Sequence, residues 1–325
     1  MIDGYEVIVV PFVVPFLART WTLSAVEVGY LLSAGVFGMA LGAVVISPLA
    51  DQIGRRRHIM LCLALITLGM LFSAFANSLP QLIAFRAFAG LFIGAIISSV
   101  NVLVSEYSSD QRRGTVMGIY GVGLPLGSAL AGTVIGPLIS AFDWRAPFVF
   151  GAALTLIMLI LVVLALPESI EYLIEKRPKG ALDQYNRIAD RFDYSRAAAL
   201  PAGFTSAHRQ VVWRSLFTGV TLYRTLCLWL GYAGLIAAFY FANTWTAKMI
   251  ADVSGDPLVG IRTGLLIMVG GVMGALLFAG LSLTIRPRLA TTLIRSVERS
   301  PSFCMHTRSI ISLSLWCCRC LSECS

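Results

Sequence analysis

The segment Ser47–Arg57, with the sequence SPLADQIGRRR, lies between two long apolar stretches at 26–49 and 58–76. It concentrates an aspartate, a glycine and three arginines into one short turn. Each flanking stretch has about the 20 apolar residues that a helix needs to cross a bilayer. Because charged side chains are costly inside lipid, the turn must lie at a membrane surface, where the two flanking spans share it. The segment therefore predicts a helical hairpin through a membrane.

The rest of the chain has the composition of a membrane protein. Of its 325 residues, 57% are hydrophobic and 13% are charged, whereas soluble domains are about half apolar and a quarter charged. The apolar runs are continuous rather than alternating, so they predict helices and not the strands of a barrel. The predicted fold class is an all-α integral membrane protein. Eight segments qualify as spans: 5–18, 26–49, 58–76, 81–104, 115–140, 146–166, 225–247 and 261–285.

Lysine and arginine are distributed unevenly between alternate loops, and this bias predicts the orientation in the membrane. The loops 50–58, 105–114 and 167–220 hold most of the positive charge. The opposite loops hold only Arg19, Arg145, Lys248 and Arg262. We therefore place the three basic loops in the cytoplasm of a multi-pass protein of the cell (inner) membrane. The net charge of +8 is explained by these basic residues, which lie in loops beside the lipid bilayer and set the orientation. No nucleic-acid partner is therefore expected.

The spacing of the spans divides the chain into four parts. Residues 1–166 form a six-helix bundle, and 167–220 form a cytoplasmic linker. Residues 221–288 supply the first two helices of a second bundle, and 289–325 form an aberrant or disordered tail. Five of the seven cysteines lie in that tail without the spacing of a zinc site, so we expect no metal or other cofactor. Four linker residues predict an amphipathic helix: Leu182, Tyr185, Ile188 and Phe192.

Two carboxylates open the first span. Asp3 and Glu6 are three residues apart, so they share one face of a helix. An acidic side chain inside a membrane span is costly and usually functional. We predict that both couple protons to the function of the protein. The alternative is that both lie in the headgroup region at the start of the helix.

The fourth span carries a stripe of small or polar residues at helical spacing: Arg86, Gly90, Gly94, Ser98, Asn101 and Ser105. An arginine at this depth must face a partner or a wet cavity. It could hold a substrate carboxylate through two parallel hydrogen bonds. We therefore predict that Arg86 and Asn101 bind a small organic anion. The alternative is an internal ion pair of Arg86 that has no substrate role.

The seventh span places Tyr232, Phe239 and Asn243 on one face of a helix. Aromatic rings beside one amide can stack on a planar ligand and orient it. Tyr232 and Asn243 are therefore predicted to bind the same substrate. The alternative is a belt of aromatic residues at the membrane surface.

The arginine-rich turn is predicted to act as a conformational latch. Asp51 can pair with Arg55 across the turn or accept hydrogen bonds from a helix N-terminus. Breaking such contacts would bias inward-open against outward-open states. The predicted gating residues are Asp51 and Arg55 together with Gly54, Arg56 and Arg113. The alternative is a solvated turn that only sets the membrane topology. The sequence contains no P-loop, catalytic triad or metal cluster, so it is not expected to be an enzyme.

These motifs together resemble the major facilitator superfamily of transporters. Four elements resemble its signatures: the turn Ser47–Arg57, Arg86 with Gly90 and Gly94, the glycine-rich stretch 118–136, and Leu166–Ser169 (LPES). Three more resemble its aromatic acid:proton symporters: Asp3–Glu6 (DGYE), Ser105–Tyr107 (SEY) and Asp143–Arg145 (DWR). Glu6 stands where that family often has aspartate, which keeps the charge.

The resemblance implies proton-driven uptake of an aromatic carboxylate, such as a hydroxybenzoate, by alternating access. Asp3 and Glu6 would couple the proton, Arg86 would serve the substrate or the coupling, and Asp51 with Arg55 would belong to the gate. The superfamily has twelve helices in two halves. A chain with eight spans would then be a monomer that lacks the last four helices through truncation or a frameshift.

Two other functions stay open at this point. A proton symporter for a sugar or another organic acid would fit the LPES element equally well. A sugar site needs several amides in the seventh span, however, and only Asn243 is present there, while Arg86 favours an anion. The third possibility is a non-transporting sensor or remnant of a transporter.

Overall fold

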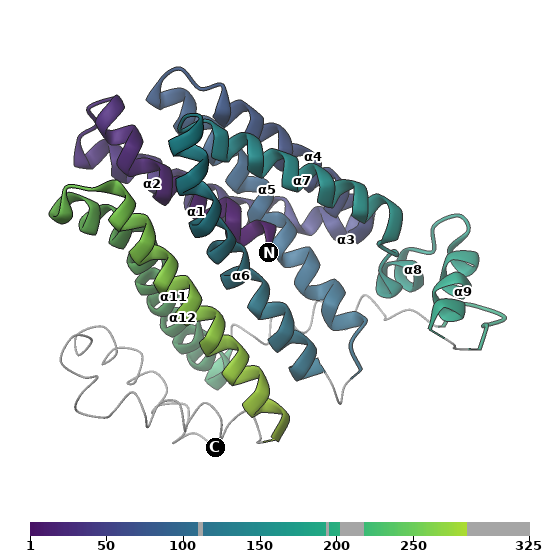
Figure 1. Cartoon of the computed structure of the whole chain (residues 1–325). Helices are drawn as coiled ribbons and strands as arrows, with labels where there is room; N and C mark the ends of the chain where they lie inside the picture. The colour runs from purple at the N-terminus through teal and green to yellow at the C-terminus, as the bar shows by residue number, and fades with distance from the viewer. Residues whose placement is uncertain (110–112, 193–194, 202–217, 285–325) are drawn as a thin grey trace. The chain divides into compact units, whose positions relative to one another are not determined.

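The computed structural model describes residues 1–109, 113–192, 195–201 and 218–284, and every regular element within these ranges is a helix (Figure 1). The elements are α1 (Ile2–Thr20), α2 (Ala25–Val45), the 3₁₀ turn η1 (Ser47–Leu49), α3 (Ala50–Ile53), α4 (Arg55–Ala74), α5 (Leu79–Glu106), α6 (Arg113–Ala141), α7 (Ala146–Ala165), α8 (Ile170–Lys176), α9 (Ala181–Arg191), α11 (Gly219–Ser254) and α12 (Pro257–Thr284). The all-helical prediction is confirmed, and each predicted span coincides with a helix, the last one up to residue 284.

Among the described residues, five helical segments are long and apolar enough to cross a membrane: Ala25–Ile53, Arg55–Ala74, Leu79–Glu106, Thr115–Ala141 and Ala146–Ala165. Their apolar side chains face outward as well as inward. Phe37 and Val44 on α2 and Leu164 on α7 are 66%, 74% and 77% exposed. Such exposure suits lipid, because lipid tails are as apolar as leucine and give apolar side chains no reason to turn inward.

The chain divides into two units, residues 1–201 with 244–279 and residues 202–243 with 280–325. In the first unit α2 packs along α5, α4 packs against both α5 and α7, and α1 packs against α6. Figure 1 shows α4 and α7 running side by side toward the short helices α8 and α9. The helices that hold the candidate site residues of this unit are therefore neighbours in space, although they are far apart in sequence.

Glycines allow the closest helix contacts of this unit. A Cβ atom on Gly42 of α2 would overlap the backbone of Leu91 in α5, and one on Gly94 of α5 would overlap the backbone of Met39 in α2. Gly90 likewise approaches the carbonyl group of Gly35. Within lipid, where no hydrophobic force drives helices together, small residues let backbones approach and gain packing contacts. The glycines of the fourth-span stripe therefore join α5 to α2.

Helix α1 lies deepest in the unit. Its residues Val9, Phe12 and Leu17 are fully buried, and its Tyr5 donates a hydrogen bond of 2.8 Å to the carbonyl oxygen of Pro147 at the start of α7. On the α6 side, the Ser128 hydroxyl donates to the carbonyl oxygen of Gly4 at 3.2 Å. Polar side chains on α1 are therefore removed from lipid and face other helices.

The turn between α2 and α4 needs a glycine at one position. Gly54 joins α3 to α4 with φ of 99°, a left-handed conformation that side chains disfavour. A Cβ atom there would also lie 2.7 Å from Oε2 of Glu168. After α7, the Ser169 side chain caps α8 by accepting a hydrogen bond from the backbone N–H of Tyr172. The turn and the segment after α7 are thus in direct contact.

The amphipathic helix predicted in the linker is α9. Its Ile188 and Ala181 pack with Leu173 of α8 in a small apolar cluster. Phe192, just after the end of α9, is half exposed and stacks against Tyr107 with ring centroids 5.8 Å apart. The linker therefore packs on the end of α5 through these contacts.

Candidate functional site

A buried polar centre joins α1, α5 and α7. The side chains of Glu6, Arg86 and Thr155 are 1%, 2% and 0% exposed. The Thr155 hydroxyl donates a hydrogen bond of 2.6 Å to Oε1 of Glu6. Nη2 of Arg86 donates to the backbone carbonyl oxygen of Glu6 at 2.7 Å, so the arginine binds the main chain of the glutamate. The structure thus brings together two of the predicted site residues and adds Thr155, which the sequence analysis missed.

Arg86 keeps unused hydrogen-bonding capacity. Its Nη1 contacts the sulfur of Met70 at 3.0 Å, while its buried Nε has no partner. The guanidinium also lies 5.9 Å from the centre of the Phe148 ring. No ion pair joins Arg86 to a carboxylate among the described residues, which disfavours the interpretation as an internal ion pair. A buried guanidinium in this state is suited to receive an anion.

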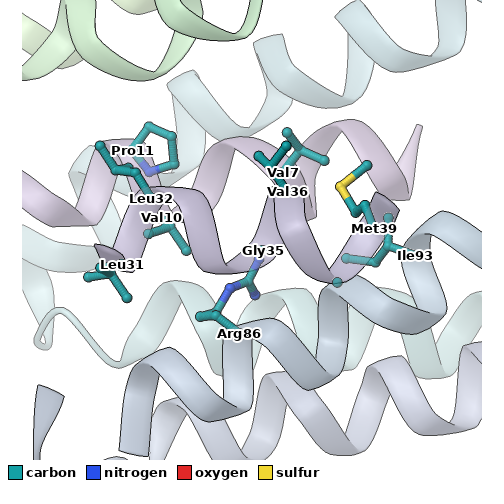
Figure 2. A pocket seen from close by; sticks show the side chains of 11 residues that line it. Val7, Val10, Pro11, Leu31, Leu32, Gly35, Val36, Met39, Arg86 and Ile93 are labelled. Atoms are coloured by element: carbon teal, nitrogen blue, oxygen red, sulfur yellow. The ribbon is translucent and has the colours of Figure 1, made fainter. Parts of the chain in front are cut away.

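The arginine lies at the edge of an apolar pocket between α1, α2 and α5 (Figure 2). The cavity itself is small, about 20 Å³, which is room for about one water molecule, so a larger ligand fits only when the surrounding helices move apart. Its lining is apolar apart from Arg86: Val7, Val10, Pro11, Leu31, Leu32, Gly35, Val36, Met39, Gly90 and Ile93. One charge on an otherwise apolar wall is the pattern of a site that orients a small ligand with an apolar body and an anionic end.

Four other residues were predicted to bind the substrate or protons. The Asp3 side chain is 24% exposed and pairs with the N-terminal ammonium group at 2.9 Å. Asn101 is half buried on α5 and does not line the Arg86 pocket. Tyr232 is 67% exposed on α11 and belongs to the second unit. The side chain of Asn243 lies outside the described residues.

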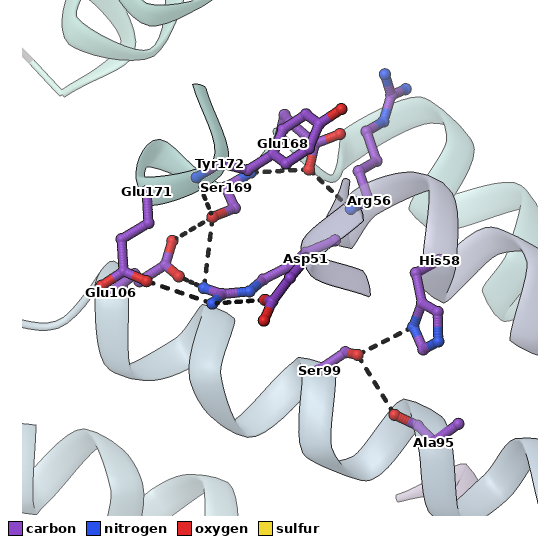
Figure 3. Close-up of polar contacts among 11 residues, drawn as sticks. Asp51, Arg56, His58, Ala95, Ser99, Glu106, Glu168, Ser169, Glu171 and Tyr172 are labelled. Atoms are coloured by element: carbon purple, nitrogen blue, oxygen red, sulfur yellow. Dashed lines mark hydrogen bonds and ion pairs between the residues drawn. The ribbon is translucent and has the colours of Figure 1, made fainter. Parts of the chain in front are cut away.

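A second polar cluster surrounds Arg55 at the turn before α4 (Figure 3). The Arg55 side chain is 10% exposed and forms an ion pair in direct contact with Glu106 of α5. It also pairs with Glu171 of α8 at 3.3 Å and with Asp51 of α3 at 3.6 Å. The Ser169 hydroxyl donates to Oε2 of Glu106 at 2.7 Å. Arg55 therefore ties α4 to three other helices, and the predicted Asp51–Arg55 pair is one part of this larger cluster.

Glu168 holds the segment after α7 against the start of α4. Its Oε1 accepts hydrogen bonds from the backbone N–H groups of Arg56 at 2.9 Å and of Ser169 at 3.0 Å. The Tyr107 hydroxyl donates to the Glu168 carbonyl oxygen at 2.7 Å. Burial raises the pKa of Tyr107 to about 12, so this hydroxyl keeps its proton at any physiological pH. Arg113, predicted as a gating residue, begins α6, is exposed, and is not among the contacts of Arg55.

Several residues of this cluster, Glu171 among them, were not predicted as gating residues. Glu106, Glu168 and Ser169 did stand out in the sequence, because they belong to the SEY and LPES elements. A buried histidine, His58, lies one turn beyond Arg55 on α4, with Nδ1 3.0 Å from the Ser99 hydroxyl. No sequence pattern pointed to that pair.

The helix arrangement and both polar centres agree with one family. The family model of the Major Facilitator Superfamily matches residues 1–297. The chain belongs to the major facilitator superfamily. This family consists of membrane transporters rather than enzymes, and within it the chain is related to transporters of aromatic acids.

Several curated transporters of the superfamily are similar to this chain. The 4-hydroxybenzoate transporter PcaK of Pseudomonas aeruginosa is 28% identical over 285 residues, covering 84% of this chain and 62% of the relative. The niacin transporter NiaP of Acinetobacter baylyi is 31% identical over 256 residues, covering 77% and 57%. The gallate transporter of Pseudomonas putida is 29% identical over 280 residues, covering 85% and 62%. The chain thus spans about 60% of the length of these relatives.

Solved structures of the superfamily share the fold. The proton:xylose symporter XylE bound to 6-bromo-6-deoxy-D-glucose matches with a TM-score of 0.68 at 15% identity, covering 86% of this chain and 66% of that structure. A bacterial homolog of the human lysosomal transporter Spinster matches with a TM-score of 0.63 at 20% identity, covering 88% and 61%. At these identities the match supports the helix arrangement and carries no information on the substrate.

Proposed function

We propose that this protein couples protons to the uptake of an aromatic carboxylate, such as a hydroxybenzoate, across the cell membrane. The proposal depends on one observation: Arg86 is 2% exposed at the edge of an apolar pocket and pairs with no carboxylate in the described ranges. A charge buried at this depth without a direct ion pair is costly, so an anionic ligand that forms one is favoured. The hydroxybenzoate and gallate transporters among the relatives support this class of substrate.

The pocket suits both ends of such a substrate. A carboxylate can accept from the free Nε of Arg86 and from a neighbouring Nη in the two-bond geometry that guanidinium groups provide. The ring then lies against apolar side chains such as Val10, Leu31 and Ile93. Burial of a benzene ring supplies affinity, and the arginine supplies orientation.

Charge balance explains why a proton would accompany the anion. In the empty site, the charge on ionised Glu6 offsets the charge on nearby Arg86. A bound carboxylate takes over that role, and Glu6 can then hold a proton and become neutral. The empty and loaded sites would therefore both carry no net charge, which lowers the cost of moving between outward-open and inward-open states within a low-dielectric membrane. The expected stoichiometry is one proton for each anion.

Thr155 can serve both protonation states of Glu6. Its hydroxyl has one hydrogen to donate, yet it lies 2.6 Å from Oε1 of Glu6 and 2.8 Å from the carbonyl oxygen of Gly151. When Glu6 is ionised, the hydroxyl donates to the carboxylate. When Glu6 is protonated, the carboxyl group donates to the hydroxyl, which turns to Gly151. Neither state leaves a buried polar group without a partner.

The cluster around Arg55 would close the cytoplasmic side of the site. It joins α3, α4, α5 and α8, so an inward opening that separates these helices must break ion pairs to Glu106 and Glu171. We propose that the turn faces the cytoplasm, in agreement with the positive charge of the neighbouring loops. The cluster would then stabilise one of the two states of the transport cycle.

Binding and transport measured on the same preparation test the proposal. The purified chain is reconstituted in liposomes, and uptake of labelled 4-hydroxybenzoate is followed with and without a pH gradient. Equilibrium binding to the chain in nanodiscs is measured in parallel, with xylose as a competing sugar. We expect saturable binding that xylose does not displace, and a loss of about tenfold or more in affinity for Arg86→Ala, since a hydrogen-bonded charge pair contributes roughly 1.5–3 kcal/mol.

The variants separate the two parts of the proposal. Glu6→Gln should keep binding and abolish stimulation of uptake by the pH gradient. Arg145→Ala is the matched control, because this arginine is 43% exposed and lies outside the pocket, and it should behave like the unmodified chain. Equal binding by Arg86→Ala, or displacement by xylose, would reject the aromatic carboxylate. Proton-driven uptake by Glu6→Gln would reject Glu6 as the coupling residue.

A further inference from the structure

A second pocket lies at the cytoplasmic end of the first unit, separate from the Arg86 pocket. It is formed by the start of α4, the segment after α7, and α8 and α9, and it contains about 1290 Å³ of empty space that includes open solvent. Figure 1 shows these elements together at one end of α4 and α7. Four of the side chains that line it are cationic: Arg56, Arg57, Lys179 and Arg187.

These cations are poorly neutralised. Arg57, Lys179 and Arg187 are exposed and form no hydrogen bond or ion pair within the part of the chain that the structure describes. Arg56 donates from Nη2 to the carbonyl oxygen of Val163 at 2.7 Å, but its buried Nε has no partner. The pocket thus gathers four positive charges whose mutual repulsion an anion would relieve.

Glu168 is the one carboxylate among the side chains that line this pocket, and it is already engaged. Its Oε1 accepts two backbone hydrogen bonds, from Arg56 and from Ser169. Figure 3 shows this carboxylate between Arg56 and Tyr172, on the side of the Arg55 cluster. Its single charge leaves an excess of three positive charges along the pocket wall.

We propose that this pocket binds a phosphate group, supplied by the headgroup of an anionic phospholipid from the cytoplasmic leaflet. Arginine forks match phosphate oxygens in pairs, and lysine adds a point charge. The lining also includes Met60 and Ile188, so the pocket offers apolar contact beside its cations. That combination suits a lipid, whose phosphate continues into an apolar body, better than it suits a free phosphate ion.

Binding there would join two parts of the cytoplasmic surface. Arg56 and Arg57 belong to α4, directly after Arg55, whereas Lys179 and Arg187 belong to the segment of α8 and α9. A phosphate that contacts both groups holds this segment against the start of α4. The lipid would thereby favour the arrangement in which the contacts of Arg55 and Glu168 are intact.

Native mass spectrometry of the full chain tests this site with phosphatidylglycerol and phosphatidylcholine as probes. The test variant is Lys179→Gln with Arg187→Gln. The matched control is Lys176→Gln with Arg191→Gln, which removes the same charge from exposed positions of α8 and α9 that do not line the pocket. The test variant should bind phosphatidylglycerol about 25-fold more weakly, roughly fivefold for each lost cation. The control should weaken binding less than about threefold, because salt screens charges at exposed positions outside the pocket.

Three results would overturn the proposal. Equal losses in the test and control variants would mean that only the overall charge attracts the lipid. Equal binding of phosphatidylcholine and phosphatidylglycerol would mean that the anionic headgroup is not recognised. Inorganic phosphate that displaces the lipid at equal concentration would assign the pocket to a soluble phosphate and reject the lipid source. Each readout is independent of transport, so failure here would leave the proposed uptake of aromatic acids unaffected.

Discussion

Replacing Arg55 with alanine tests whether the cluster around it is a buried ion pair or a solvated turn. The side chains of Arg55 and Glu106 are 10% and 7% exposed, so a carboxylate left alone there would lose its partner without gaining water. Removing one member of a buried pair costs about 3–5 kcal/mol. Asp51 and Glu171 are 41% and 54% exposed, so each adds at most about 1 kcal/mol. We expect Arg55→Ala to lower the free energy of unfolding by about 3–5 kcal/mol.

A double-mutant cycle isolates the pair itself. Glu106→Ala should cost less, about 2–3 kcal/mol, because Arg55 keeps its other two carboxylates. The double variant leaves neither buried charge behind. Its cost should therefore fall below the sum of the single costs by about 2 kcal/mol or more, which is the coupling energy of the two residues. Equilibrium unfolding in mixed detergent micelles measures all three free energies.

The exposed pair of Arg145 with Asp143 provides the control. These groups lie 3.8 Å apart and are 43% and 51% exposed, so the same cycle there should give a coupling below about 1 kcal/mol. If the cost of the double variant equals the sum of the costs of Arg55→Ala and Glu106→Ala within about 0.5 kcal/mol, the two residues do not interact. That result would refute the reasoning.

Three more predictions follow from single contacts. Thr155→Val should lower proton-driven uptake about tenfold by removing one hydrogen bond to a charged group, whereas Thr155→Ser and the exposed control Thr133→Val should retain it. Gly42→Ala should reduce the unfolding free energy by about 1–3 kcal/mol through overpacking, while Gly29→Ala, where a Cβ atom meets nothing within 4 Å, should not. Tyr107→Phe should cost about 1 kcal/mol equally at all pH values between about 5 and 9, because the hydroxyl stays protonated throughout; a cost that changes across that range would contradict its raised pKa.

Hydropathy predicted the helices because lipid imposes a single solution on the backbone. Inside a bilayer each N–H and C=O must be satisfied within the segment, so a continuous apolar run of sufficient length becomes a helix. The same reasoning picked out Arg86 and Glu6, since a charge in such a run is too costly to be incidental. The amphipathic α9 followed from spacing alone, because burial of one helix face requires that periodicity.

Partners of those charges were not predictable, because they come from distant parts of the chain. Arg86 binds the main chain of a residue 80 positions away, and Thr155 reaches Glu6 across 149 positions. Periodicity reports which face of a helix a residue occupies and says nothing about which helix it meets. Asp3, which shares the predicted face with Glu6, contacts the terminal ammonium group.

The sequence by itself thus determined the class of the protein, its helices and the residues whose charge demands an explanation. Only the tertiary structure decided how those residues are used: Arg55 as the centre of a cluster with Glu106 and Glu171, and Arg86 as a donor to the Glu6 main chain at the edge of an apolar pocket. The physical reason is that the cost of burying a charge depends on the residue and its depth in the membrane, whereas its compensation depends on the helices that pack around it.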